Sequence, residues 1–586
     1  MVAFGRGEAG IGVLRIGGRG GPGRPRVPSS YPGRDGPRPD VAPYELRNVT
    51  PPGDRRPAAD GWRTVDPTTA PSGGPTTAPL PTVRTRGRAD AADLLPRGAR
   101  FTLSGPAPLG AGSCDGGGTL TENTRPNAPG TRRVVPADSK PVDADRVQQL
   151  LAEEWDRFTS WSQASGEHNR RASTSLPLGV TSSFQHWDPY PITIESARGA
   201  HLTDVGGNRL LDLSMGFGAG LVGHLNPRVV EEVTHALTSI GTLFVTPSSQ
   251  ATDMAERFKR RFDLDMLRFT NSGTESLMYA IRSARAYTGR SGIAKIEGGY
   301  HGGYDALQVS VKPALEDIGP ADRPIPDAPA DAVPGEVHVV AYNDLGQLER
   351  AFREHGGSIA AFVVEPVIEN LAIVLPDEGY LEGVRALCDE YGVVLIFDEV
   401  KTGLTAGHGG AAQRLGIKPD LITLAKSIGG GLPLAAFGGK QEIMDVVVDG
   451  RMAHFGTYNG NALVMAAAKA VDELITPEAS AGLEALNTRT LDTLDAIIGE
   501  YELPAHTVGL GAKGCVTWAT GPVRNYRDYK ATDFGVAELS WLWGVNRGVL
   551  TPPGLDEQWL VSLAHTEDDM SVLIEDFRSL AEALRA

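Results

Sequence analysis

Cysteine is scarce in this chain, and its scarcity excludes two kinds of cysteine-based stabilisation. Only three cysteines occur in 586 residues, at the widely separated positions Cys114, Cys388 and Cys515. An odd number of distant cysteines fits neither a disulfide framework nor a zinc site built from clustered thiolates. We therefore predict a protein of a reducing compartment, and the sequence singles out no metal-ligating residues.

Long apolar runs and an excess of positive charge are also missing. No stretch of about 18 consecutive apolar residues occurs, as a membrane-spanning helix would need, and the first residues do not have the pattern of a secretory signal. The formal net charge is -16 at pH 7, whereas proteins that mainly bind nucleic acid carry a basic excess. We expect a cytoplasmic protein with neither a membrane nor a nucleic acid as partner.

The charge is divided unevenly between residues 1–140 and the rest of the chain. Residues 1–140 contain 20 Lys and Arg but only 12 Asp and Glu, and all but one of these cations are Arg. Runs such as GRGGPGRPRVP have no hydrophobic periodicity, so they cannot bury enough apolar area to offset the loss of chain entropy. We predict that residues 1–140 are a disordered Gly/Pro/Arg-rich tail that is dispensable for activity.

Regular structure is predicted from about Asp143 onwards, beginning with an amphipathic helix for which Asp145 is a candidate N-cap. Between about residues 265 and 440, short apolar segments such as VVLIFDEV and DLITLA alternate with helical ones such as TESLMYAIRSARAY. This alternation indicates a mostly parallel sheet covered by helices. We predict an α/β fold with an N-terminal segment at 141–225, a large domain at 226–455 and a smaller α+β C-terminal domain at 456–586.

Three segments place reactive groups after strands, where ligands bind in an open parallel sheet. The loop NSGTE suits a phosphate because small residues and a helix N-terminus follow the strand, although an ordinary capped helix has the same pattern. Asp398 and Glu399 end an apolar strand and need a cationic partner there, either a pyridinium nitrogen or nucleotide-bound magnesium. Lys426 stands between LITLA and three glycines, either as a solvated loop residue or as a desolvated nucleophilic amine.

Taken in order, the segments NSGTE, GGYHGG, VVEPV, FDEV and TLAKSIGGGLP resemble one family. They are similar to the class III aminotransferases of pyridoxal-phosphate (PLP) fold type I, the aspartate aminotransferase-like fold, and most of all to the glutamate-1-semialdehyde aminomutase-like branch. The similarity runs from about residue 175 to the C-terminus. The resemblance implies PLP as cofactor and transfer of an amino group between an amine or amino acid and a carbonyl compound.

The resemblance also implies roles for particular residues. In the family, the lysine of TLAKSIGGG forms a Schiff base with PLP and the aspartate of FDEV pairs with the pyridine nitrogen, so Lys426 and Asp398 are the expected catalytic residues. Further cofactor contacts are implied at Ser272, Gly273, Thr274, Tyr300, His301, Glu365, Asn370 and Val400. Thr457 matches a threonine that reaches the phosphate from the neighbouring subunit, which implies a homodimer with shared active sites.

The same resemblance leaves the substrate open. Gln185 stands where the aminomutases have an arginine for the substrate carboxylate, and Glu557 where they have a gating glutamate. An amide in place of that cation removes most of the charge pairing, although Arg198 or Arg547 could supply a substitute. Trp187 and its neighbours suggest instead a pocket for an aromatic, cyclic or sugar-like substrate.

Three hypotheses for the activity follow. The first is an aminotransferase acting on small-molecule amines and carbonyl compounds, which the missing arginine favours. The second is a glutamate-1-semialdehyde 2,1-aminomutase, which moves the amino group within one molecule to make a tetrapyrrole precursor. The third is a non-catalytic PLP-binding regulator, which would need a helix-turn-helix module that residues 1–140 do not suggest.

Overall fold

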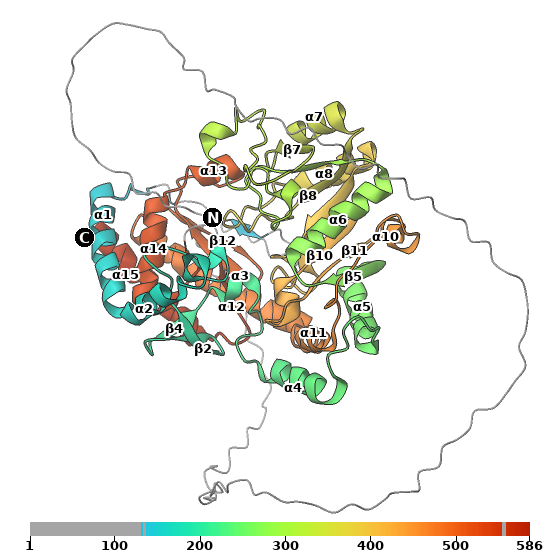
Figure 1. The fold of residues 1–586 in the computed structure, drawn as a ribbon. Helices are drawn as coiled ribbons and strands as arrows, with labels where there is room; N and C mark the ends of the chain where they lie inside the picture. Colours follow the sequence, from blue (N-terminus) through green and yellow to red (C-terminus); the bar gives the residue numbers. More distant parts are fainter. Residues whose placement is uncertain (1–129, 133–135, 137, 554–557) are drawn as a thin grey trace, which may run out of the picture. The chain divides into compact units, whose positions relative to one another are not determined.

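The computed structural model describes residues 130–132, 136, 138–553 and 558–586 of the chain (Figure 1). The predicted tail over residues 1–140 lies almost entirely outside these residues. Cys114 and Glu557 also lie outside them. The predictions for the tail and for Glu557 therefore stay predictions.

A seven-stranded sheet with the order β5-β11-β10-β9-β8-β6-β7 carries most of the candidate site. The strands from β10 to β7 are mutually parallel, whereas β11 is antiparallel to both of its neighbours. The prediction of a mostly parallel α/β sheet is confirmed. In chain order the strands are β5 (Met266–Thr270), β6 (Gly292–Ile296), β7 (Val337–Val340), β8 (Ile359–Val364), β9 (Val394–Asp398), β10 (Leu421–Leu424) and β11 (Ala435–Gly439).

Both faces of this sheet are buried, which explains why its strands are continuous apolar runs. In β9, Leu395 and Phe397 join one hydrophobic core, while Val394 and Ile396 join another. Helices α7 and α8 contribute to the first core and α6 to the second, as expected when helical crossovers cover a parallel sheet. The helices of this region are α5 (Ser249–Phe262), α6 (Gly273–Thr288), α7 (Leu345–His355), α8 (Tyr380–Tyr391), α9 (Gly410–Leu415) and α10 (Gln441–Val448).

Two four-stranded sheets complete the described fold. One has the order β1-β12-β13-β15 and is antiparallel throughout, and the other has the order β14-β4-β3-β2. In the second sheet, β14 near the C-terminus runs parallel to β4, so the N-terminal strands pair with a late segment of the chain. The bounds are β1 (Thr131–Arg132), β2 (Ile194–Arg198), β3 (His201–Asp204), β4 (Arg209–Asp212), β12 (His506–Leu510), β13 (Lys513–Thr517), β14 (Val549–Leu550) and β15 (Trp559–Leu560).

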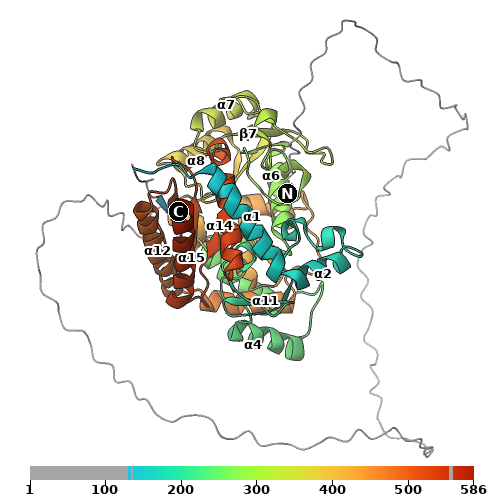
Figure 2. The same ribbon diagram turned by 90° about the vertical axis from the view of Figure 1, so that its left-hand side faces the viewer.

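A helix near the start of the described chain packs against one near its end, and two helices of the C-terminal part pack against each other (Figure 2). Helix α1 (Ala144–Trp161) lies against α14 (Phe534–Asn546), and α12 (Pro477–Glu500) lies against α15 (Glu567–Arg585). The other helices are α2 (Gln163–Ala172), α3 (Met215–Gly218), α4 (Pro227–His235), α11 (Ala462–Leu474) and α13 (Tyr526–Lys530). None of the helices within the described ranges is long and apolar enough to cross a membrane.

The start of α1 differs from the prediction by two residues. Its N-cap is Asp143, whose carboxylate accepts hydrogen bonds from the Asp145 N–H at 2.9 Å and the Arg146 N–H at 3.3 Å. The expectation that Asp145 caps the helix was wrong. Two acids at neighbouring positions both suit a first turn, and only the backbone geometry decides which of them accepts.

Candidate active site

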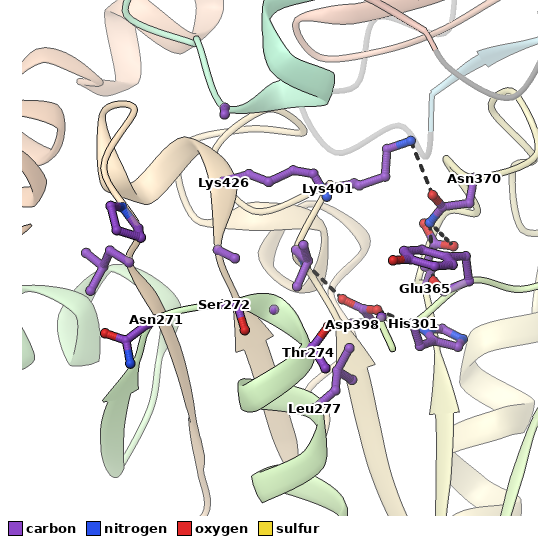
Figure 3. A pocket seen from close by; sticks show the side chains of 18 of the residues that line it. Asn271, Ser272, Thr274, Leu277, His301, Glu365, Asn370, Asp398, Lys401 and Lys426 are labelled. Carbon is purple, nitrogen blue, oxygen red and sulfur yellow. Dashed lines mark hydrogen bonds and ion pairs between the residues drawn. The ribbon is translucent and has the colours of Figure 1, made fainter. Parts of the chain in front are cut away.

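A cavity of about 430 Å³ lies at the carboxyl ends of the parallel strands (Figure 3). Its walls come from the segments that follow β5, β6, β8, β9 and β10. The lining includes Ser272, Gly273, Thr274, Tyr300, His301, Glu365, Asn370, Asp398, Val400 and Lys426. The fold thus brings together, in one cavity, residues that the sequence motifs singled out separately.

The N-terminus of α6 forms one side of the cavity. Ser272 caps the helix, because its hydroxyl accepts a hydrogen bond from the Glu275 N–H at 3.2 Å. The first N–H groups of a helix have no acceptor within the helix, and the helix dipole adds a partial positive charge. Gly273 and Thr274 therefore present a backbone that suits a phosphate group.

A tight contact holds the neighbouring loop against this helix end. The Thr274 hydroxyl accepts a hydrogen bond from the Gly303 N–H at 3.1 Å. Gly302 has a φ of +83°, and a Cβ at this position would lie 2.4 Å from the Thr274 hydroxyl oxygen. Glycine is required at residue 302 both for its backbone conformation and for the close approach.

Asp398 ends β9 and is buried in the cavity wall. Its Oδ2 lies 2.8 Å from His301 Nδ1, and its Oδ1 accepts a hydrogen bond from the Val400 N–H at 3.0 Å. Burial holds the pKa of His301 below its usual value, which favours a neutral ring. A carboxylate needs a donor, so we assign the single ring proton to Nδ1. The histidine fixes the orientation of the carboxylate.

Glu399, the next residue, has a different structural role. Its carboxylate accepts hydrogen bonds from the Ala411 and Ala412 N–H groups, at 2.6 and 2.9 Å, at the start of α9. Burial raises the pKa of Glu399 to about 7. A Cβ on Gly410, which has a φ of +77°, would lie 2.4 Å from Glu399 Oε2. Of the acidic pair, Asp398 lines the cavity, and Glu399 is accommodated by a helix N-terminus.

Lys426 follows β10, and its side chain extends across the cavity (Figure 3). Its φ of 51° lies in the left-handed region that non-glycine residues rarely adopt. Such a conformation costs about 1–3 kcal/mol and persists only where the surrounding structure imposes it. The adjoining strand Leu421–Leu424 is fully buried, so the backbone that carries the lysine is firmly held.

A chain of polar contacts closes another side of the cavity (Figure 3). Asn370 Nδ2 donates to Glu365 Oε1 at 2.8 Å, and Lys401 Nζ lies 3.5 Å from Asn370 Oδ1 and donates to the Glu369 carbonyl at 2.8 Å. Burial, together with the nearby charge of Asp398, raises the pKa of Glu365 to about 8. Glu365 therefore carries a proton at neutral pH.

Lys401 also lines the cavity, although the sequence analysis did not single it out. The available signal was its position in DEVKTG, three residues after the aspartate that ends β9. A second overlooked feature is the buried ion pair between Lys513 Nζ and Glu369 Oε2, which are 2.6 Å apart. Lys513 belongs to β13, so this pair ties the smaller antiparallel sheet to the segment between Glu365 and Asn370.

Two residues expected at the substrate lie outside the cavity lining. Gln185 is exposed, and its side-chain oxygen accepts hydrogen bonds from the Thr181 N–H and hydroxyl at 3.1 and 2.8 Å. Trp187 packs edge-on against Trp541, with ring centroids 4.4 Å apart, and also contacts Phe158 of α1. The structure accounts for Trp187 as a packing residue of an aromatic cluster.

Neither arginine considered as a substitute cation lines the cavity. Arg198 is exposed at the end of β2. Arg547 forms an ion pair with the buried Glu154 at 2.9 Å, and its guanidinium lies 3.5 Å from the centre of the Trp543 ring. Among the cavity-lining side chains of the described chain, Lys401 and Lys426 are the ones with a cationic group.

Thr457 lies in an exposed loop and does not line the cavity of its own chain. The aromatic residues beside it are unusually open, since Phe455 is 80% exposed and Tyr458 is 58% exposed. Tyr458 contacts Phe244, which is itself 44% exposed. The loop is tied to the cavity rim by a hydrogen bond from Asn271 Nδ2 to Asn459 Oδ1 at 2.8 Å.

The fold and the cavity together define a PLP-dependent enzyme of fold type I. A mostly parallel sheet presents a lysine, an aspartate and a helix N-terminus around one cavity, and these groups fit the aldehyde, the pyridine nitrogen and the phosphate of PLP, respectively. Comparison with known proteins narrows the class. Residues 183–532 match the family model for class III aminotransferases, and the chain belongs to this family.

Relatives of known name agree with this assignment. Glutamate-1-semialdehyde 2,1-aminomutase 2 of Brevibacillus brevis is 37% identical over 437 residues, which cover 71% of this chain and 100% of that protein. The structure of a glutamate-1-semialdehyde aminomutase from Pseudomonas aeruginosa in complex with PMP has a TM-score of 0.69 at 26% identity, covering 76% of this chain and 99% of that one. An omega-transaminase from Sphaerobacter thermophilus has a TM-score of 0.68 at 30% identity, covering 72% and 98%. The cofactor of this chain is PLP, and its substrates are small molecules.

Proposed function

We propose that Lys426 is the residue that bonds covalently to PLP, and that Asp398 faces the pyridine nitrogen. The observation that carries this assignment is their shared cavity: Lys426 follows β10, Asp398 ends the adjacent strand β9, and the N-terminus of α6 forms part of the same wall. Ser272, Gly273 and Thr274 would hold the phosphate. Tyr300, Val400, His301, Glu365 and Asn370 would surround the ring, as the family resemblance implies.

The chemistry of each residue follows from its position. Bound PLP supplies an electron sink for a carbanion next to the amino group. Asp398, oriented by His301, keeps a negative charge where a protonated ring nitrogen needs one. Lys426 Nζ, when it is not bonded to the cofactor, is an amine inside the cavity that could take a proton from the substrate carbon and deliver it to the carbon on the other side of the amino nitrogen. Glu365, protonated at neutral pH, adds no charge beside Asp398.

Absorbance spectroscopy tests the assignment of Lys426. The purified protein is saturated with PLP, passed through a desalting column and scanned for the visible band of the lysine-bound cofactor, before and after addition of a panel of amines. Lys426→Ala should lack the band, and Lys401→Met, which changes another lysine of the same cavity, should keep it. A band of wild-type intensity in Lys426→Ala would contradict the assignment.

We propose that the enzyme transfers the amino group between two substrates, as an aminotransferase. The position of Gln185 supports this proposal, because its side chain is engaged with Thr181 outside the cavity and offers no cation to a glutamate-semialdehyde carboxylate. The rival activity, glutamate-1-semialdehyde 2,1-aminomutase, is supported by relatives with that name, which match over 94% to 100% of their length. Incubation with glutamate-1-semialdehyde alone should give no 5-aminolevulinate, whereas amines with an added keto acid should give a new amino acid. The opposite result favours the aminomutase.

We also propose a homodimer in which Thr457 reaches the phosphate of the neighbouring subunit. The exposed aromatic residues around Thr457 support this, because large open apolar patches usually mark interfaces. Co-expression of Lys426→Ala with Thr457→Arg tests it. If the sites are shared, each variant alone should be inactive and the mixed dimer should regain activity, because one of its two sites then has neither change. A mixed dimer as inactive as both parents would contradict the shared site.

A cytoplasmic location is a further part of the proposal. Cys388 and Cys515 are free and buried thiols, and free thiols persist in a reducing compartment.

A further inference from the structure

Two histidines and one glutamate meet at the edge of the seven-stranded sheet, away from the cavity. Glu336 immediately precedes the edge strand β7, His338 lies within it, and His355 is the last residue of α7. One ligand atom from each of the three side chains lies within 4.8 Å of the others. The group is at the amino end of β7, whereas the cavity is at the carboxyl ends of the parallel strands.

The three side chains lie close together, and the two imidazole rings are stacked at an interplanar angle of 22°. Glu336 Oε1 lies 2.9 Å from His338 Nε2, and the His338 and His355 rings have centroids 4.2 Å apart. A tetrahedral zinc ion bound at about 2.0–2.1 Å by two imidazoles would hold the donor nitrogens about 3.3 Å apart and the ring centroids about 5 Å apart. Binding would require His355 to turn its ring out of this stack; its side chain is 46% exposed and lies at the end of α7.

The surrounding contacts support ligand chemistry. The Ser358 hydroxyl hydrogen-bonds to Glu336 Oε1, and it also lies 2.9 Å from the His355 carbonyl. Glu336 Oε1 therefore has two hydrogen-bonding partners, the Ser358 hydroxyl and His338 Nε2. Partners of this kind orient the ligands of metal sites. His355 Nε2 also lies 4.0 Å from a carboxylate oxygen of Glu354.

We propose that Glu336, His338 and His355 form a binding site for a divalent transition-metal ion of the zinc class. Imidazole and carboxylate are donors that zinc accepts, and three protein ligands leave a fourth position for water. The ion would join the edge strand β7 to the end of α7 and stabilise that side of the domain. The proposal does not depend on the catalytic assignment, because none of the three residues lines the cavity.

Zinc titration of the untagged holoenzyme tests the proposal. After removal of metals by a chelator and dialysis, isothermal titration with ZnCl₂ should show one equivalent per chain, and the thermal midpoint should rise with zinc. His338→Ala and His355→Ala should each weaken binding about tenfold or more. His235→Ala is the matched control, because His235 is also the exposed last residue of a helix, and it should bind zinc as the wild type does.

Two results would overturn the proposal. One is the absence of a zinc equivalent in the wild type, and the other is unchanged affinity in His355→Ala, whose exposed side chain can be removed without disturbing the core. Cobalt provides a check on coordination, because Co²⁺ in a tetrahedral site gives a visible absorbance that hydrated Co²⁺ lacks. That absorbance should be present in the wild type and lost in His355→Ala. Full retention of it in the variant would also contradict the site.

Discussion

The buried ion pair between Lys513 and Glu369 gives the sharpest test of how β13 is held to the segment that follows β8. The side chains of Lys513 and Glu369 are 1% and 0% exposed, and Glu369 Oε1 has no hydrogen-bond partner among the described residues. Lys513→Met removes the cation and leaves a buried carboxylate behind. Breaking a buried pair in this way costs about 3–5 kcal/mol, which lowers the ratio of folded to unfolded protein by more than about two orders of magnitude.

The double variant Lys513→Met/Glu369→Gln separates two effects of Lys513→Met, the loss of the ion-pair interaction and the burial of an unpaired carboxylate. Two neutral side chains of similar volume avoid the stranded carboxylate, so the double variant should recover most of the stability lost by Lys513→Met. The free energy of unfolding of the single and the double variant is measured by urea unfolding of the holoenzyme at a fixed excess of PLP, followed by tryptophan fluorescence and circular dichroism. The reasoning is refuted if Lys513→Met lies within about 1 kcal/mol of the wild type, or if the double variant is no more stable than the single one.

Three further predictions concern the cavity and its support. Burial raises the pKa of Glu365 to about 8, so the native state keeps a proton that the unfolded chain releases, and this contribution to stability falls as the pH rises from about 4.5 to about 8. Glu365→Gln should therefore make the urea midpoint fall less between pH 5 and pH 9. Curves of midpoint against pH that run parallel for the variant and the wild type would contradict this. His301→Leu, which has no donor for Asp398, should lower the affinity for PLP roughly 10- to 100-fold in a PLP titration, because a buried hydrogen bond to a charged group is worth about 1.5–3 kcal/mol. Unchanged affinity would show that the histidine does not position the carboxylate. Gly410→Ala should lower the free energy of unfolding by about 2–5 kcal/mol, because it adds left-handed backbone strain and displaces Glu399. Gly416→Ala is the control: its φ of +70° is similar but the space around it is open, so in the same urea assay it should lose only the stability that the backbone strain accounts for.

The residues of the cavity were predictable because each belongs to a motif that also determines local structure. The strand that ends at Asp398 is a continuous apolar run, and the strand before Lys426 ends in the same way, so both residues had to lie at the same edge of a parallel sheet. Ser272 follows another strand and has the residue type of a helix cap. Local sequence therefore predicted both the elements and the ends at which the reactive groups lie.

Other features depend on contacts that local sequence does not contain. The antiparallel direction of Ala435–Gly439 leaves no mark in its hydrophobic pattern, which is that of a buried strand in either orientation. The partners Glu369 and Lys513 are 144 residues apart, so only the folded chain shows that they meet. Trp187 has a side chain suited to a ligand pocket or to a core, and in the structure it packs against Trp541. Residue type alone could not decide whether Trp187 lies in a ligand pocket or in the core.

The packing of α1 against α14 has a consequence for how the protein is made. The Trp161 indole donates to Asn546 Oδ1 at 2.8 Å across 385 residues of chain, and translation at about 5–20 residues per second needs roughly 20–80 s to cover that distance. Until then the apolar face of α1, which includes Leu150 and Phe158, has no partner helix. We expect ribosome-bound chains halted before residue 534 to be captured by chaperones through this face, and Leu150→Ser to reduce the capture. The first helix of the fold would be one of the last to be buried, so the vulnerable period of this enzyme lasts for most of its synthesis.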